Sequence, residues 1–231
     1  MADKNIVQAV DKGEVMIARA KDFWTKYQKQ IMVVCGAIIV IGGGWLVYNK
    51  FFKDPNEKKA AVAMFKAEEY YRMDSVKLAL NGDGGNAGLL KIISQYGGTK
   101  AANLAHFYAG VCYTRLDDNP NVIKHLEKFS TSAKQTQQRA YKLLADAYGE
   151  TGKFKEAFEY YKKSANEFEA DENSAAAALF YAAYTAQKKL NKPNDAIELC
   201  KEIKNKFPSA AEYTFQADAM LAELGVYNTD N

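Results

Sequence analysis

Hydrophobic residues follow three different patterns along this chain of 231 residues. From Asn5 to Gln30, apolar residues are spread among Lys, Arg, Asp and Gln, which predicts one or two amphipathic helical pieces with Gly13 as a break. The stretch Ile31 to Tyr48 then carries eighteen residues without a charge or a strong polar group. The remainder shows helical spacing interrupted by short loops, and nothing in it alternates as a strand does. The pattern therefore predicts an all-α chain.

The apolar stretch from Ile31 to Tyr48 has the length of a membrane-spanning helix. At 1.5 Å per residue it covers about 27 Å, which is close to the thickness of the hydrocarbon core. Trp24 and Tyr27 precede it and Trp45 lies near its end, where aromatic residues often mark the membrane interface. A buried core helix seldom runs so far without a charge, and a cleavable signal peptide would begin earlier and end at small residues. We therefore expect an uncleaved anchor in the lipid bilayer.

The charges around this anchor give no orientation. Five Lys or Arg residues lie within twenty residues on each side, so the positive-inside rule returns a tie. The head, residues 1–30, has six basic and four acidic residues, so lying on the membrane surface and docking on a partner protein both stay open. Small residues in the stretch (Cys35, Gly36, Ala37 and Gly42 to Gly44) would let a partner helix approach, although no strict G-x-x-x-G occurs.

Helix starts and stops divide the rest of the chain. Asp54-Pro55-Asn56-Glu57 combines a capping Asp, a Pro in the first turn and a Glu three residues after the cap, which predicts a helix to about Met73. Loop residues cluster from Asn81 to Asn86. Further boundaries are predicted at Gly97-Gly98-Thr99, Asn119-Pro120, Lys192-Pro193 and Phe207-Pro208. These signals predict helices of about 12 to 18 residues joined by short loops.

Three segments of the body align with a common period of 34 residues: 103–136, 138–171 and 177–210. In the middle segment small residues stand at repeat positions 8 and 20, aromatic residues at 11, 17 and 24, and glycine at 15 (Ala145, Ala157, Tyr148, Phe154, Tyr161 and Gly152). Asp117 and Asn191 replace this glycine in the other two segments, and both residue types tolerate left-handed backbone. The period is that of the tetratricopeptide repeat, whose small and aromatic positions pack two helices together.

We therefore expect one transmembrane helix followed by an α-solenoid of antiparallel helix pairs. The head covers residues 1–30, the anchor 31–48 and the solenoid 54–231. A degenerate unit over 60–95 would cap the solenoid at the membrane side, and a closing helix over 208–224 would end it. The five residues 172–176 before the third segment predict an extended helix there.

The chain resembles membrane-anchored repeat proteins of Bacteroidota-type bacteria, and its architecture is similar to that of YfgM-like ancillary subunits of the Sec translocon. The segments 74–83 and 96–105, together with the head, the anchor and the repeats, carry this resemblance. It implies an inner-membrane protein with a cytoplasmic head and a periplasmic body. It further implies partners among translocon components, chaperones and translocating polypeptides, although repeat folds host many roles.

Composition adds no sign of an enzyme or of nucleic-acid binding. The net charge is +3, which leaves the chain after the head close to neutral. Three cysteines without a C-x-x-C and two histidines offer no recognised metal site, and a disulfide between Cys112 and Cys200 stays open. Gly82 to Ala87 formally matches G-x-G-x-x-A, but the residues before it read as helix, not strand. We expect no cofactor, no metal and no small-molecule substrate.

The resemblance also assigns a concave surface to repeat positions 2, 5, 6, 9, 12 and 13. It names Phe107, Tyr108, Val111, Arg115, Arg139, Lys142, Asp146, Glu150, Tyr181, Thr185, Lys188 and Lys189 as candidate partner-binding residues. Aromatic rings beside cations suit a peptide or the tail of a partner protein. The expected function is therefore a membrane-tethered interaction module, in the translocon or as a chaperone-like adaptor. A scaffold of another cell-envelope or secretion complex is the first alternative, and an enzyme on a helical array is the second.

Overall fold

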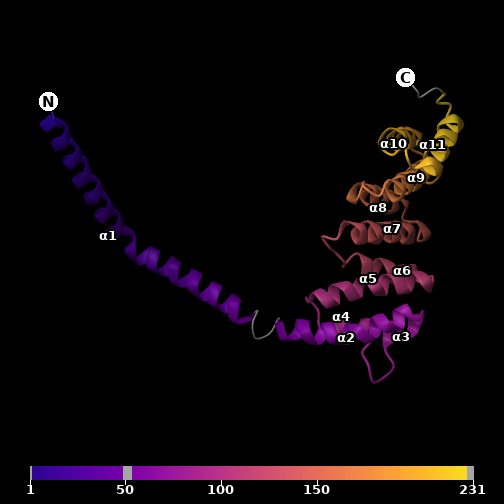
Figure 1. Cartoon of the computed structure of the whole chain (residues 1–231), viewed down its shortest axis with the longest axis horizontal. Helices are drawn as coiled ribbons and strands as arrows, with labels where there is room; N and C mark the ends of the chain where they lie inside the picture. Colours follow the sequence, from indigo (N-terminus) through magenta and orange to yellow (C-terminus); the bar gives the residue numbers. More distant parts are fainter. Residues whose placement is uncertain (1, 49–53, 228–231) are drawn as a thin grey trace. The chain divides into compact units, whose positions relative to one another are not determined.

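The computed structural model describes residues 2–48 and 54–227, and these residues are helical with no strand among them. Apart from helices and turns they contain one isolated bridge, between Gly82 and Ala87. Contacts divide the chain into two compact units, with the boundary between Pro55 and Asn56. The all-α class predicted from the sequence is confirmed for the described residues (Figure 1).

The first unit is built on α1 (Ala2–Tyr48), a single helix of 47 residues. The helix continues through Gly13, so the predicted break there is wrong, and no boundary separates the head from the apolar stretch. One glycine costs a helix only about 1 kcal/mol, which the neighbouring helix-forming residues offset. The segment Met16–Trp45 is long and apolar enough to cross a membrane, with a mean hydropathy of 1.3 and none of its apolar window buried.

The helices of the second unit follow one another in a row, and from α4 to α11 each helix packs mainly on its neighbours in sequence (Figure 1). Loops of a few residues reverse the chain between the longer helices, so consecutive helices lie side by side. The helices are α2 (Asp54–Arg72), α3 (Val76–Asn81), α4 (Leu89–Gln95), α5 (Lys100–Arg115), α6 (Asn119–Leu126), α7 (Lys134–Glu150), α8 (Phe154–Glu167), α9 (Glu172–Lys188), α10 (Pro193–Lys206) and α11 (Ala211–Glu223).

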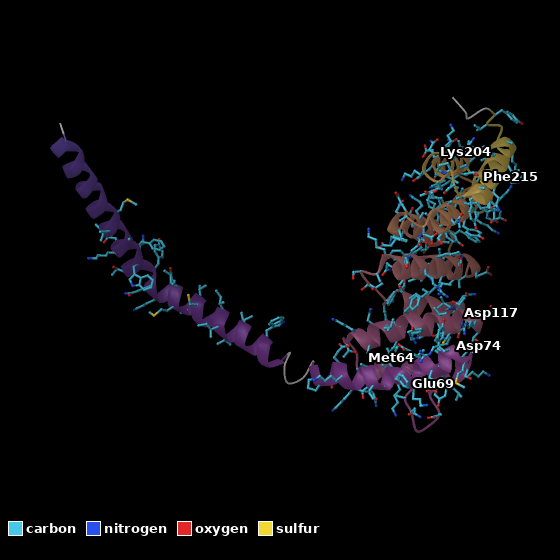
Figure 2. All side chains as sticks on the ribbon, viewed as in Figure 1. Met64, Glu69, Asp74, Asp117, Lys204 and Phe215 are labelled. Carbon is cyan, nitrogen blue, oxygen red and sulfur yellow. The ribbon has the colours of Figure 1, made fainter. Side chains whose placement is uncertain are left out.

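One type of helix ending recurs through the second unit. Alternate long helices are each followed by a residue with positive φ: Asp74, Asp117, Gly152, Asn191 and Gly225. Asp74 and Asp117 are labelled at these helix ends in Figure 2. The sequence predicted left-handed backbone at Asp117, Gly152 and Asn191, and this prediction is confirmed. Asp and Asn are the residues other than glycine that enter this conformation at the lowest cost.

The same backbone hydrogen bonds close four of these five endings. Ser75, Asp118, Lys153 and Val226 donate their N–H groups to the carbonyls of Tyr70, Tyr113, Tyr148 and Leu221, the bond of a Schellman cap. At the end of α9 the bond from Lys192 instead reaches Ala186, so this turn holds one residue more than the others. The buried face of α9 is therefore shifted by one residue relative to the turn that follows it.

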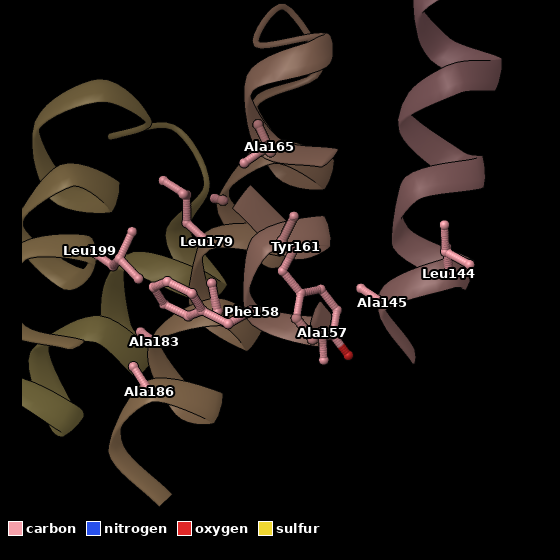
Figure 3. Close-up of a cluster of buried hydrophobic side chains, with 14 of the residues drawn as sticks. Leu144, Ala145, Ala157, Phe158, Tyr161, Ala165, Leu179, Ala183, Ala186 and Leu199 are labelled. Carbon is pink, nitrogen blue, oxygen red and sulfur yellow. The ribbon is translucent and has the colours of Figure 1, made fainter. Parts of the chain in front are cut away.

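Small residues let the helices approach closely in the core. Ala145, Ala157 and Ala183 are fully or almost fully buried, and the rings of Phe158 and Tyr161 fill the space beside them (Figure 3). The interface between α5 and α6 is closer still, because a Cβ atom on Gly110 would lie 2.5 Å from the side chain of Leu126. Ala145, Ala157, Tyr161 and Gly110 stand at the small and aromatic repeat positions read from the sequence, whereas Ala183 and Phe158 do not.

The first part of the second unit differs from the predicted helix pair. Residues 60–95 contain α2 and two short helices, α3 and α4, separated by the predicted loop. Asp83 closes this loop: its carboxylate accepts from the Tyr70 hydroxyl at 2.6 Å and from the N–H of Asn86 at 2.6 Å, and these bonds lower the pKa of Asp83. The loop thus packs back onto α2.

Two predicted helix signals have other roles in the structure. Glu57 was expected to cap its own helix, but its two carboxylate oxygens accept from the N–H groups of Lys100 and Ala101, at 2.8 and 3.1 Å, and so cap α5. Pro208 lies in a turn after α10, and the closing helix begins at Ala211 rather than at residue 208. A buried Phe207 ends α10 and holds this turn against the core.

Candidate functional site

Two hollows of about 800 and 470 Å³ open along α7 and α9 and share Lys142 as a wall. Residues of α8 and α11 complete them. We call the two hollows together the α7–α9 groove. It is lined by Gln135, Gln138, Arg139, Lys142, Asp146, Gly149, Glu150, Phe154, Tyr161, Ser164, Asp171, Asn173, Ser174, Ala177, Tyr181, Tyr184, Thr185, Lys189, Glu212 and Tyr213.

A polar network fixes the floor of the groove. Lys142 and Asp146 are one helical turn apart on α7, and the amine lies 2.8 Å from the carboxylate. The Tyr161 hydroxyl of α8 donates to the other oxygen of Asp146 at 2.7 Å. Burial and the Asp146 carboxylate raise the pKa of Tyr161, which keeps its hydroxyl protonated as a donor. The three side chains therefore hold each other in place across two helices.

Aromatic rings form the exposed part of the groove. The Tyr161 and Tyr181 rings stack with centroids 5.7 Å apart, and the Lys142 amine lies 5.2 Å from the centroid of the Tyr181 ring. Tyr181 is 39% exposed and Tyr184 is 44% exposed. Lys189 stands at the other side, with its amine 5.3 Å from the centroid of the Phe154 ring. The groove thus offers open ring faces with cations beside them.

The other hollow is more polar. The Arg139 side chain is exposed and makes no ion pair with any residue that the structure describes. Gln138 is buried, and its side-chain amide donates to the backbone carbonyl of Phe168 at 3.2 Å. The backbone carbonyl of Gln138 accepts from the Ser164 hydroxyl at 2.9 Å. The groove can therefore bind a flexible chain through ring faces, a free cation and hydrogen-bonding groups.

Seven of the twelve candidate residues named from the sequence line the groove: Arg139, Lys142, Asp146, Glu150, Tyr181, Thr185 and Lys189. Thr185 is 6% exposed and its hydroxyl donates back to the carbonyl of Tyr181 at 2.8 Å. It shapes the wall, but its polar group is already used within α9. The shift of one residue at the end of α9 turns Thr185 inward and Tyr184 outward.

Phe107 and Val111 do not line a groove, and this part of the prediction is corrected. Both are buried in the core, with 8% and 5% of their surface exposed. The ring of Phe129, from the segment after α6, lies against Phe107 with centroids 5.0 Å apart. Because that segment contributes to the core, it leaves these two side chains no free surface for a partner.

Tyr108, Arg115 and Lys188 join neighbouring helices. The Arg115 guanidinium lies 2.5 Å from the Asp74 carboxylate and 4.7 Å from the centroid of the Tyr71 ring. Tyr108 packs edge-on against the same Tyr71 ring, with centroids 4.9 Å apart. These contacts tie α5 to the end of α2. Lys188 forms an ion pair with Glu223, which ties α9 to α11.

Sequence reasoning missed several groove residues, among them Tyr184 and Tyr213. The alignment put Tyr184 at the small-residue position of its repeat, where the structure has the buried Ala183 instead. One signal was present, because an alanine, Ala183, directly precedes the tyrosine. Tyr213 lies on α11, outside the three aligned segments, so the period gave no position for it.

The histidine and cysteine side chains of the second unit lie in its core or at the edge of it. The described residues hold no group of three or more His, Cys, Asp or Glu side chains placed to share a metal ion. The Nδ1 atoms of His106 and His125 lie 3.1 Å apart. Cys112 and Cys200 are free, fully buried and in different clusters, and burial raises their pKa values to about 11 and about 12. A disulfide between them is therefore not formed, and neither thiol is a ready nucleophile.

Comparisons of the chain with protein families, with curated proteins and with solved structures each found no match.

Proposed function

We propose that this chain is a single-pass membrane protein whose helical body captures segments of other proteins in the α7–α9 groove, with no catalysis of its own. The observation that carries the proposal is the exposure of Tyr181 and Tyr184 between Lys142 and Lys189. Large rings supply contact area at a low cost in conformational entropy, and such residues dominate binding energy where they are accessible.

The body in this proposal is a tetratricopeptide-type α-solenoid. Support comes from the helix ending that recurs at Asp74, Asp117, Gly152, Asn191 and Gly225, since a repeated turn is what a repeated helix pair requires. Further support comes from the order of packing, in which the helices from α3 to α11 contact their sequence neighbours. In solenoids of this kind the first helices of successive pairs line one surface, which suits a groove along α7 and α9.

The anchor in this proposal is the apolar part of α1. The candidate span Met16–Trp45 includes the uncharged stretch that begins at Ile31, and its apolar window is not buried, which suits a lipid environment better than water. From the resemblance to YfgM-like subunits, we place the head in the cytoplasm and the body in the periplasm of a bacterial inner membrane. The partners are then components of the Sec translocon, chaperones or polypeptides that emerge from it.

The groove suits an extended polypeptide segment with an aromatic or aliphatic side chain and an acidic group. The apolar side chain would cover the rings of Tyr181 and Tyr184, and the acidic group would pair with Arg139, a cation of the groove that forms no ion pair with a described residue. The Lys142 amine is already compensated by Asp146, so it contributes less new attraction.

A site-specific photo-crosslinker tests this proposal in intact membranes. A benzophenone amino acid replaces Tyr184 in the groove, and in a matched control it replaces Tyr227, an exposed tyrosine outside the groove. We expect adducts with Sec components or emerging polypeptides from position 184 only. Equal adducts at both positions, or none at position 184, would rule out capture in the groove. Groove-specific adducts with a different envelope complex would instead support a scaffold of that complex.

A further inference from the structure

A row of apolar residues runs along α1 with alternating spacings of three and four. It consists of Ile17, Ala20, Trp24, Tyr27, Ile31, Val34, Ile38, Ile41 and Trp45, and we call it the seam. In the sequence the same spacing extends back to Gly13, Val10 and Ile6. None of the ten charged residues between Ala2 and Tyr48 falls on it. The row thus continues from the polar head into the apolar stretch without a change of register.

The spacing is that of a two-stranded coiled coil. On a straight helix of 3.6 residues per turn, a repeat of 3.5 residues drifts sideways by about 20° per heptad. The row therefore stays in contact with one partner only if two helices wind around each other with a left-handed twist. The row is selective in the head, where charged residues occupy the other faces of the helix. From Ile31 to Tyr48 every position is uncharged, so the register there is marked by the residues that flank the row.

The seam has no cover among the described residues. Ile17 is 59% exposed, Trp24 55%, Ile38 63% and Trp45 64%, and the apolar window of α1 is not buried. Because α1 is unbroken from the head into the apolar stretch, a membrane-spanning α1 carries the head away from the bilayer. The head therefore cannot lie flat on lipid, which was one of the two placements left open by the sequence. A protein partner is needed to cover its apolar face.

Within the apolar stretch, the positions that flank the seam are small. They are Cys35, Ala37, Gly42 and Gly44. A Cβ atom on Gly42 or Gly44 would meet nothing within 4 Å, so no contact inside the chain explains these glycines, each of which costs the helix about 1 kcal/mol. Small flanking residues let two membrane helices pack closely. Gly36 and Gly43 lie on the opposite face and are not explained in this way.

We propose that the seam pairs with the seam of a second copy of this chain, in parallel. The inference rests on the membrane anchor of the proposed function, because two copies inserted with the same orientation can only pair in parallel. Each seam residue then meets its own counterpart. Across the head, the flanking Lys21 faces the flanking Met16 of the other copy, and Phe23 faces Gln28, so no like charges meet. Because the seam can pair with an identical seam, the partner that covers it is a second copy of this chain.

Disulfide scanning of the full chain in membranes tests the pairing. In a Cys35→Ala background, Ala20→Cys and Val34→Cys place a thiol on the seam, while Ala18→Cys and Val33→Cys are matched substitutions off the seam. Cys112 and Cys200 are buried and remain in every variant. After mild oxidation, we expect several-fold more disulfide-linked product from positions 20 and 34 than from positions 18 and 33, with twice the mass of the chain.

Equal crosslinking on and off the seam, or a crosslinked product of another mass, overturns pairing with a second copy. Alkaline carbonate extraction of the same membranes separates this result from failure of the anchor. A chain that stays in the membrane but does not crosslink refutes the pairing alone, whereas a chain released by carbonate refutes the anchor and with it the parallel pairing. Neither the crosslinking nor the carbonate extraction depends on binding in the α7–α9 groove.

Discussion

Single residues at the helix ends decide how the chain turns in the second unit. Gly152 has a φ of 76° and ends α7, and no atom outside its own chain neighbours would crowd a Cβ there. A side chain at this position is therefore penalised by backbone conformation alone. Asp117 and Asn191 bear the same penalty in part, because their short polar side chains reduce it without removing it.

Replacing Gly152 by alanine should lower the free energy of unfolding by about 1 kcal/mol, the cost of left-handed backbone for an L residue. Gly149→Ala is the matched control, since Gly149 lies within α7 and its Cβ would meet only Ala157, at 4.0 Å. That control should be neutral or stabilising by up to about 1 kcal/mol. Urea unfolding of both variants measures the difference. Equal effects would contradict the role of the left-handed turn.

The paired histidines make stability depend on pH. Burial, with smaller contributions from His106, Lys124 and Lys128, lowers the pKa of His125 to about 4, and burial also lowers the pKa of His106. An unfolded histidine has a pKa of about 6.5, so below that pH the unfolded chain binds more protons and stability falls as pH falls.

For His125 alone, the free energy of unfolding should fall by about 2 kcal/mol between pH 7 and pH 5. Urea unfolding at several pH values measures this slope. A His125→Gln variant removes the titrating ring, so its slope over the same range should be smaller by that amount, whatever its stability at pH 7. The same slope in both proteins would show that the pair does not control the acid sensitivity.

Burial explains the main errors in the site prediction. Repeat positions describe an average pair of helices, and they place Phe107 and Val111 on an open surface. In this chain α6 has only eight residues, and Phe129 from the following segment covers Phe107. Pattern and period thus located the face of α7 that lines the groove, but they carried no information on how the segments between helices fold back.

At the scale of the helices, some residues that fit a local sequence pattern make their contacts with a distant part of the chain instead. Glu57 belongs to a local capping pattern, yet it caps α5 across a separation of more than forty residues. The N–H groups at the start of α5 have no partner within their own helix, and a carboxylate from another helix can satisfy them. Sequence spacing identifies a residue that can cap a helix, but it does not identify which helix that residue caps.

Glu57→Ala should therefore destabilise α5 by about 1 kcal/mol, the usual cost of a lost helix cap. Because the N–H groups of Lys100 and Ala101 donate to the Glu57 carboxylate, the effect should also appear as faster hydrogen exchange at these two amides. Glu198→Ala, at an exposed site within α10, serves as the control for loss of one acidic side chain. Unchanged exchange in α5 would show that the cap contributes nothing.

At the scale of the whole molecule, the second unit has its own core and α1 has none. Two adjoining clusters of buried residues run from α2 to α11, and Tyr71 and Tyr113 pack against both. The boundary between the two units, between Pro55 and Asn56, lies beside the helix start that the sequence indicates at Asp54. The sequence did not reveal that the head and the apolar stretch form one helix, because an isolated glycine resembles a break equally well.

A fragment of residues 54–231 should therefore fold without α1 and remain monomeric, while the full chain in detergent should be dimeric. Light scattering coupled to size-exclusion chromatography measures both masses, and circular dichroism measures the helix content. The thiols of Cys112 and Cys200 should react with a thiol reagent only on unfolding, since both are fully buried. A dimeric fragment would place the pairing surface in the body rather than on α1.

The recurring left-handed residue has a consequence for how this protein can change length. It marks a fixed joint, while the segments between successive joints differ in size, from the long segment between Asp74 and Asp117, which holds α3, α4 and α5, to the shorter helix pair of α6 and α7 between Asp117 and Gly152. A gene that duplicates or deletes the stretch from one joint to the next would keep every backbone connection intact. Such a chain could lengthen its binding surface in steps of one helix pair without redesigning any helix.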